Sequence, residues 1–168
     1  MFRMSSFVFL LLLFFQILVG CNVQDKETTV YLVRHAEKVL TDTTDNPPLT
    51  PEGEMRAEQL IKEMGGIEFE KIFSTEYDRN INTIKPLANS QSIEISIYSW
   101  YDWHPVLNDI KKSSGKNYLI CGHGDNLLPM IEYLGGDKPF DALDKHEYDN
   151  IFKVTLGAQK SDVEVIKY

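Results

Sequence analysis

The chain has 168 residues, a formal net charge of −8 and 43% hydrophobic residues. This length and apolar content suit one globular domain with its own hydrophobic core, and they exclude a disordered chain. The acidic balance argues against a large polyanionic partner, so we expect no nucleic-acid binding. A small pocket in which basic groups converge remains compatible with phosphate binding.

The first 21 residues have the pattern of a signal peptide. Residues 1–3 include one arginine, and residues 7–19 are apolar apart from Gln16. This run is shorter than the roughly 20 residues of a membrane-spanning helix. The following Leu18-Val19-Gly20-Cys21 resembles the lipobox of bacterial lipoproteins, which implies cleavage before Cys21 and a diacylglycerol on its thiol. An uncleaved anchor helix with a coincidental cysteine is the alternative.

A lipidated Cys21 predicts a protein of the bacterial cell envelope, anchored to a membrane by lipid and facing the periplasm or the exterior. Residues 22–27 are polar and are interpreted as a tether, and residues 28–168 as the folded domain. Cys121 is the only other cysteine, so we expect no internal disulfide. It lies in an apolar stretch, where a buried, inert thiol is expected. The oligomeric state is not indicated.

The first part of the domain reads as a strand, a loop and a helix. Thr29–Val33 is apolar and β-branched, which predicts a buried strand. Leu40–Pro48 is rich in Thr, Asp, Asn and Pro and is expected to form a loop over the site. Thr50 should cap a helix that Gly65-Gly66 ends, with Arg56 as a surface residue.

The middle of the domain repeats this alternation. Lys71–Ser74 predicts a second strand, followed by a helix that begins near Tyr77-Asp78 and is kinked or ended by Pro86. Ile93–Tyr98 alternates apolar and polar residues, as a strand does. The dense aromatic cluster Trp100–Pro105 is either a lid on a pocket or a packing cap.

The last third adds two helices and three strands. Val106–Lys112 predicts a short helix, Tyr118–Cys121 a strand, and the stretch from Leu127 a helix ended by Gly135-Gly136. Residues 136–150 are acidic and loop-like, and two strands at 151–156 and 163–168 close the domain. This alternation predicts an α/β fold, a three-layer α/β/α sandwich with a mostly parallel central sheet.

Ionisable residues follow three of the predicted strands at the point where each ends. Arg34-His35-Ala36-Glu37-Lys38 follows the first strand, Gly122-His123-Gly124-Asp125 follows Tyr118–Cys121, and Ser74-Thr75 leads into the helix that carries Arg79. In open α/β sheets ligands bind at the carboxyl ends of the strands. Arginine offers a fork of donors matched to phosphate or carboxylate, and neutral histidine is a nucleophile or proton carrier. We therefore expect Arg34, His35, Arg79 and His123 on one rim.

In this order and setting the residues resemble the histidine phosphatase superfamily, the phosphoglycerate-mutase-like group. The matching parts are Arg34-His35-Ala36-Glu37, Leu49-Thr50-Pro51-Glu52-Gly53 at a helix start, Ser74-Thr75 followed by Arg79 and Thr83, and Gly122-His123. The resemblance implies a phosphoglycerate-mutase-like fold and a small single-domain phosphatase that needs no metal or cofactor. Relatives often carry Arg-Thr where this chain has Arg79-Asn80.

The same resemblance implies the chemistry. His35 would attack phosphorus and become a phosphohistidine that water hydrolyses, while Arg34, Arg79 and His123 bind the substrate's non-bridging oxygens. The general acid is less defined: Asp125 ranks first, then Glu76, then Asp102. Glu37, beside the nucleophile, is expected to hold local structure. The expected ligand is a small phosphorylated substrate, and the location disfavours mutase activity and cytoplasmic phosphohistidine proteins.

Two other functions fit parts of the pattern. A lipoprotein that binds phosphorylated ligands without turnover could use the same arginines and histidines. A metal-dependent hydrolase could use His35, Glu37, His123 and Asp125 as ligands. Two arginines in the same site would repel a cation, which disfavours the second alternative.

Overall fold

The computed structural model describes residues 27–168. The expected signal peptide with Cys21, and residues 22–26 of the expected tether, lie outside the described residues. Between residues 27 and 168, no helix is both long enough and apolar enough to cross a membrane.

A six-stranded sheet forms the centre of the domain, in the order β3-β2-β4-β1-β5-β6. The pairs β1–β4, β2–β4 and β2–β3 are parallel, and β5 runs antiparallel to both of its neighbours. The predicted mostly parallel sheet is thereby confirmed. The strands are β1 (Thr29–Arg34), β2 (Lys71–Thr75), β3 (Ile95–Tyr98), β4 (Asn117–Gly122), β5 (Asn150–Thr155) and β6 (Asp162–Lys167).

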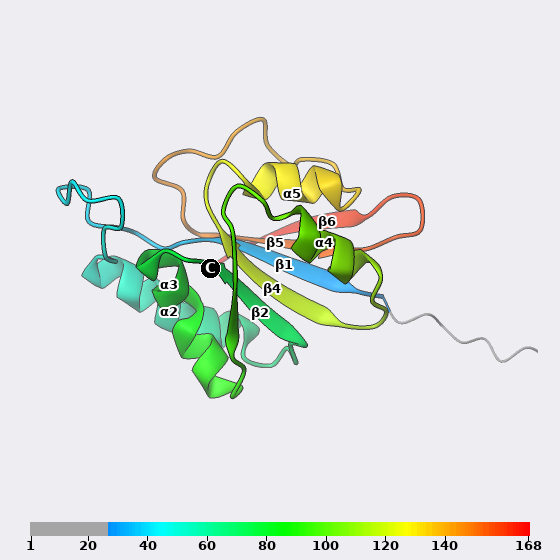
Figure 1. Ribbon diagram of the computed structural model, residues 1–168, viewed down its shortest axis with the longest axis horizontal. Coiled ribbons are helices and arrows are strands. Elements are labelled where there is room, and N and C mark those ends of the chain that lie inside the picture. Colours follow the sequence, from blue (N-terminus) through cyan, green and yellow to red (C-terminus); the bar gives the residue numbers. More distant parts are fainter. Residues whose placement is uncertain (1–26) are drawn as a thin grey trace, which may run out of the picture.

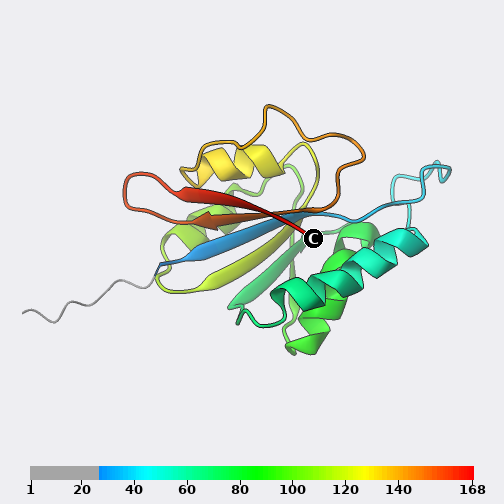
Figure 2. The same ribbon diagram turned by 180° about the vertical axis from the view of Figure 1, so that it is seen from behind.

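Helices cover both faces of this sheet, which makes the predicted three-layer sandwich (Figures 1 and 2). One layer holds α2 and α3, and the other holds α4 and α5. The helices are α2 (Pro51–Met64), α3 (Asp78–Ser90), α4 (His104–Lys111) and α5 (Leu127–Tyr133).

Alternate residues of β1 explain how one strand serves two cores. Val30 and Leu32 are fully buried against the α4/α5 layer, whereas Tyr31 and Val33 point into the α2/α3 layer. A strand buried on both faces reads as a continuous apolar run, as Thr29–Val33 does. Burial on both faces fixes the register of β1. It therefore also fixes where Arg34 and His35 lie at the carboxyl end of the strand.

The helix boundaries follow local signals in most cases. Thr50 caps α2, since its hydroxyl accepts a hydrogen bond from the Gly53 amide at 3.1 Å. Two details differ from expectation. Of the two outcomes expected at Pro86, an early end of the helix is wrong: α3 continues to Ser90, because Ile84 and Leu87, on either side of the proline, are fully buried against the sheet. Helix α4 starts at His104 rather than Val106, with Pro105 in its first turn, where a missing amide hydrogen is tolerated.

Candidate active site

The carboxyl ends of β1 and β4 bring two histidines together. Arg34 pairs with Gly122 in the parallel register, and the His35 amide donates to the Gly122 carbonyl at 3.1 Å. The rings of His35 and His123 lie with their centroids 5.6 Å apart. They face a pocket of about 600 Å³ that Arg34 and Arg79 also line.

His35 is held in one tautomer. The residue is 4% exposed, and Nδ1 lies 2.8 Å from the Ala36 carbonyl oxygen, which can only accept a hydrogen bond. Nδ1 therefore carries the proton, and Nε2 keeps its lone pair. Burial lowers the pKa of His35 to about 3, and the charges of Arg34 and Arg79 act in the same direction. The imidazole is thus neutral near pH 7 and can act as a nucleophile.

His123 is neutral for similar reasons. Burial lowers its pKa to about 4, with Arg79 adding to the shift and Asp125 opposing it. Its Nε2 lies 3.1 Å from the Thr75 hydroxyl, at the end of β2. Three neighbouring strands therefore position the two rings.

Both arginines are fixed by carbonyl groups and aromatic rings, and both keep an unused donor. Arg34 Nη1 donates to the Asp144 and Glu147 carbonyls, at 2.9 and 3.1 Å, and its guanidinium lies 4.5 Å from the centre of the Tyr148 ring. Arg79 lies over Tyr77 at 4.3 Å. The Nε atoms of Arg34 and Arg79 are buried without a hydrogen-bond partner. Buried donors of this kind are costly unless a ligand satisfies them, and a charge-assisted bond to an oxyanion would do so.

Helix α3 is tied directly to the strand ends. The Ala36 amide donates to the Thr83 hydroxyl at 2.8 Å, and the Asn80 amide nitrogen donates to the Gly122 carbonyl at 2.9 Å. Asn80 is fully buried, so the residue that departs from the family pattern links the Arg79 helix to β4. In the loop expected over the site, the Asp45 carbonyl accepts a hydrogen bond from Arg79 Nη1 at 3.3 Å.

The three candidate acids lie in different surroundings. Asp125 lines the main pocket and also a smaller one of about 180 Å³, where it faces Tyr77 and Trp100. Glu76 is exposed, and among the described residues it does not line either pocket. Asp102 is exposed, and its Oδ1 lies 3.9 Å from His104 Nδ1. It does not line either pocket.

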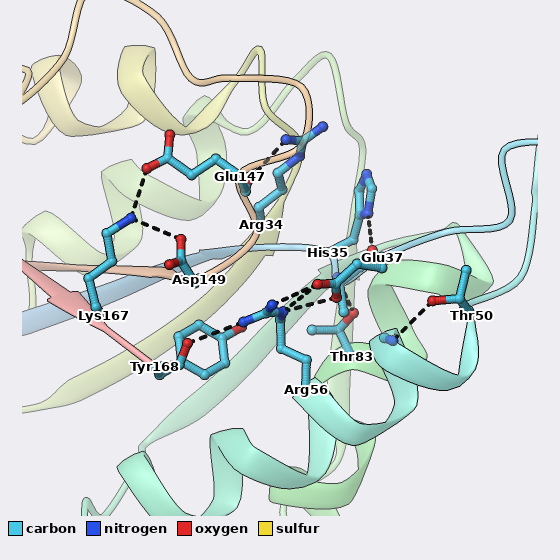
Figure 3. A network of polar contacts seen from close by, with 12 residues as sticks. Arg34, His35, Glu37, Thr50, Arg56, Thr83, Glu147, Asp149, Lys167 and Tyr168 are labelled. Atoms are coloured by element: carbon cyan, nitrogen blue, oxygen red, sulfur yellow. Dashed lines mark hydrogen bonds and ion pairs between the residues drawn. The ribbon is translucent and has the colours of Figure 1, made fainter.

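Glu37 lies against Arg56 of α2 (Figure 3) and does not line the pocket. Its carboxylate accepts hydrogen bonds from Nε and Nη2 of Arg56, and the shortest of these is 2.6 Å. The expectation that Arg56 is a plain surface residue was therefore wrong, because its partner lies 19 positions earlier in the chain. The pairing agrees with a local structural role for Glu37 and removes it from the metal-ligand set considered from the sequence. Over residues 27–168, no group of three or more His, Cys, Asp or Glu side chains is arranged to hold a metal ion.

The aromatic cluster divides between the two roles left open by the sequence. Trp100 lines the smaller pocket, whereas Trp103 stacks on His104 at 4.0 Å and meets Tyr133 edge-on. Cys121 is fully buried, as expected for an inert thiol, and burial raises its pKa.

Several pocket residues carried no signal in the sequence. Lys38 lies directly after the Arg-His segment but was given no role, and three charged residues come from the loop between α5 and β5. That loop has no periodic pattern in sequence, so its place over the pocket follows from tertiary contacts such as those with Arg34. The missed charged residues are Lys38, Lys138, Asp141 and Lys145.

Comparison with known proteins gives a family match for part of the chain. Residues 30–99 match the model of the histidine phosphatase superfamily (branch 1). The matched region contains Arg34, His35 and Arg79. No curated protein sequence matches the chain.

Solved structures share the fold at low sequence identity. A phosphoglycerate mutase from Bacillus anthracis str. Sterne is 14% identical, with a TM-score of 0.67 over 84% of this chain and 93% of that one. The alpha-ribazole phosphatase from Shigella flexneri is 15% identical, with a TM-score of 0.65 over 83% and 96%. The protein histidine phosphatase SixA, complexed with tungstate, is 17% identical, with a TM-score of 0.61 over 83% and 96%.

At these identities the neighbours show a shared fold, and the family model matches residues 30–99, less than half of the chain. The domain therefore has the fold of the phosphoglycerate mutase structure, and its sequence similarity to the histidine phosphatase superfamily lies in residues 30–99.

Proposed function

We propose that the protein is a metal-independent phosphatase that hydrolyses small phosphomonoesters through a phosphohistidine on His35. The supporting observation is the combination of a neutral His35, whose Nε2 lone pair is available, with two buried arginine Nε donors that lack a partner in the same pocket. A phosphoryl group placed there would meet the nucleophile and satisfy both donors.

In the first step His35 Nε2 forms a bond to phosphorus while the bond from phosphorus to the ester oxygen breaks. The leaving oxygen takes a proton from a general acid, and the imidazole, already protonated at Nδ1, becomes phosphorylated at Nε2. Arg34, Arg79 and His123 hold the non-bridging oxygens, whose charge is rearranged in the transition state. In the second step water attacks phosphorus, the same acid group accepts the water proton, and the bond to Nε2 breaks to release phosphate.

Asp125 is the general acid in this proposal. It is the one member of the three candidate acids that lines the pocket shared with His35 and His123. It also borders the smaller pocket beside Trp100, so both pockets offer a leaving group a place next to its carboxyl. Glu76 and Asp102 would need to move to reach the same position.

Lipid attachment at Cys21 outside the cytoplasm completes the proposal. The described chain enters the domain at the amino end of β1, whereas Arg34 and His35 follow its carboxyl end. An anchor on the N-terminal side would therefore leave the pocket at the opposite end of the sheet, open to substrates in the surrounding compartment. Metabolic labelling with a fatty acid tests the attachment, and Cys21→Ser should abolish the label.

The activity is tested by hydrolysis of an aryl phosphate by the full-length chain, with excess chelator, beside His35→Ala. Turnover that survives chelation and is lost in the variant by at least about 10³-fold is expected, because the nucleophile contributes more than a single oxyanion donor. Quenching the reaction in base should trap a phosphate that is stable to base and labile to acid.

Loss of turnover on chelation would overturn metal independence. Turnover unaffected by His35→Ala would overturn the phosphohistidine route. Absence of turnover with thermal stabilisation by phosphate would favour ligand binding without catalysis. Lys62→Gln, on the outer side of α2, is a matched control for purification and assay.

A further inference from the structure

The loop between α5 and β5, residues 136–149, brings two lysines to the pocket. Lys138 and Lys145 line it together with Asp141. The loop is fixed relative to the part of the pocket beside His35 and Arg34, here called the phosphate end, because its Asp144 and Glu147 carbonyls accept hydrogen bonds from Arg34 Nη1. Lys145 lies between Asp144 and Glu147 in the sequence, next to Asp144.

Most acidic side chains of this otherwise acidic loop are paired elsewhere. Glu147 and Asp149 both bind Lys167, at 2.8 and 2.9 Å, on the side of Arg34 away from His35 in Figure 3. Asp137 pairs with Lys160, and the Asp144 carboxylate accepts the His146 amide at 2.8 Å. Asp141 is the loop carboxylate that remains at the pocket. The loop therefore presents its lysines to the pocket and turns most of its negative charge away.

The phosphate end already carries enough positive charge for a phosphomonoester. Arg34, Arg79 and Lys38 line it, and the pKa of Lys38 is lowered first by burial and then by the charges of the two arginines. A phosphate group carries about −1.5 to −2 charge near pH 7. These three cations balance it, so the two loop lysines exceed what phosphate binding requires.

The two lysines are also weakly engaged by the protein. Lys138 contacts Glu132 at 3.2 Å in a solvent-exposed pair, which is worth little. Lys145 has no ion pair with any residue in the described range 27–168. A pocket of about 600 Å³ has room for a whole small molecule beyond its phosphate. Leu128 and Leu143 provide apolar surface between charged groups.

We propose that Lys145, assisted by Lys138, binds a second anionic group of the substrate. The substrate class is then a phosphomonoester that carries a carboxylate or a second phosphate several bonds from the scissile one. This inference rests on the proposed phosphatase function and specifies its substrate. Asp141 opposes the lysines electrostatically, so its removal should strengthen binding of the second anion.

The test uses the full-length chain with three aryl phosphates: phenyl phosphate, 4-carboxyphenyl phosphate and 1,4-phenylene bisphosphate. The quantity compared is the ratio of kcat/KM for each charged substrate to that for phenyl phosphate. We expect one charged substrate to be preferred, and Lys145→Gln to reduce that preference by about 3- to 10-fold through KM. Lys138→Gln should reduce it less, and Asp141→Asn should increase it. Which charged substrate is preferred distinguishes a carboxylate from a second phosphate.

Lys62→Gln, with the same charge change on α2, should leave every ratio as in the wild type. Equal ratios in the wild type and in Lys145→Gln, with phenyl phosphate still hydrolysed, would overturn the second-anion subsite and leave the phosphatase function standing. Removing a lysine should lower the kcat/KM ratio, and removing Asp141 should raise it. General damage to the loop would lower the ratio in both cases, so the two effects can be told apart.

Binding provides an arm that does not depend on turnover. If no aryl phosphate is hydrolysed, thermal stabilisation by 4-carboxyphenylphosphonate is compared with that by phenylphosphonate. Greater stabilisation by the carboxylated compound, lost in Lys145→Gln, would support the subsite while the phosphatase function fails. Equal stabilisation by the two phosphonates would overturn the subsite.

Discussion

Arg56 Nε lies 2.9 Å from both carboxylate oxygens of Glu37, and Arg56 Nη2 lies 2.6 Å from one of them. Arg56 Nη1 also donates to the Tyr168 carbonyl at 3.2 Å. Because Glu37 follows His35 by two positions, the pair attaches the segment after His35 to α2 and to the residue beyond β6 (Figure 3). This contact joins three parts of the chain that are distant in sequence.

Breaking this pair should lower stability more than a typical surface substitution. Burial alone would raise the pKa of Glu37, but the hydrogen bonds from Arg56 outweigh burial and hold that pKa below its usual value. Arg56→Gln leaves a partly buried carboxylate without its partner, and we expect a loss of about 1–2 kcal/mol in the free energy of unfolding. Urea unfolding of Glu37→Gln, Arg56→Gln and the double variant gives the coupling energy. Additive losses would show that the two side chains do not depend on each other.

The sequence predicted the site best where buried strands determine it. Thr29–Val33 and Tyr118–Cys121 are apolar and buried, so polar residues can reach the sheet edge only where these strands end. Arg34 follows the first strand directly, and His123 follows the second after Gly122. The Arg56 partnership was missed because a surface helix gives no sign of which side chain meets another segment. The lysines of the 136–149 loop were missed for a similar reason, since a loop without periodicity is placed by tertiary contacts such as the one with Arg34.

Two glycines beside His123 allow a matched comparison of one added methyl group. A Cβ at Gly122 would lie 2.6 Å from Asn126 Oδ1, which accepts the His123 amide, and 2.8 Å from Leu127 Cδ2. A Cβ at Gly124 would lie 3.3 Å from Arg34 Cζ. We expect Gly122→Ala to cost about 1–3 kcal/mol of stability, because the clash is with packed atoms. Gly124→Ala should change stability less and lower kcat/KM by about 10-fold, because it displaces the guanidinium of Arg34, the proposed phosphate-binding group.

Thermal unfolding and aryl phosphate hydrolysis of the two variants check this separation. Equal stability losses would show that the Arg34 side cannot adjust to the extra methyl. Normal activity in Gly124→Ala would show that the guanidinium position has more freedom than the close approach suggests.

Stability should fall on mild acidification because of the two site histidines. Burial lowers the pKa of His35 to about 3 and that of His123 to about 4, from an ordinary value of 6.5. Below pH 6.5 the unfolded chain binds protons that the folded chain does not, so their contribution is complete above 6.5 and is lost as the pH falls toward 4. Because two histidines each take up a proton on unfolding, the slope of the free energy of unfolding against pH approaches about 2.7 kcal/mol per pH unit.

Urea unfolding between about pH 6.5 and pH 5 measures that slope and stays above the range in which most carboxylates titrate. We expect His35→Asn to reduce it toward the value for one histidine. An unchanged slope would show that His35 remains solvated enough to take up a proton in the folded state.

Arg79→Lys should separate charge from geometry at the phosphate site. Lysine keeps the positive charge but loses the Nε donor, which is buried without a partner, and the stacking on Tyr77 at 4.3 Å. We expect kcat to fall by about 10²–10³-fold, the usual effect of removing one oxyanion donor. Vanadate inhibition should weaken more than phosphate inhibition, since vanadate resembles the transition state. Equal weakening of both would assign Arg79 to ground-state binding alone.

Asp125→Asn tests the general acid through the leaving group. An alkyl phosphate needs its leaving oxygen protonated, so kcat should fall by about 10²–10⁴-fold, whereas 4-nitrophenyl phosphate should lose much less because nitrophenolate leaves without a proton. Glu76→Gln and Asp102→Asn are matched controls, since both are exposed and lie outside the linings of the pockets that Asp125 borders. If one of these controls instead shows the leaving-group dependence, its segment must move over the pocket during turnover. Equal losses on both esters in Asp125→Asn would give Asp125 a role in substrate binding rather than in proton transfer.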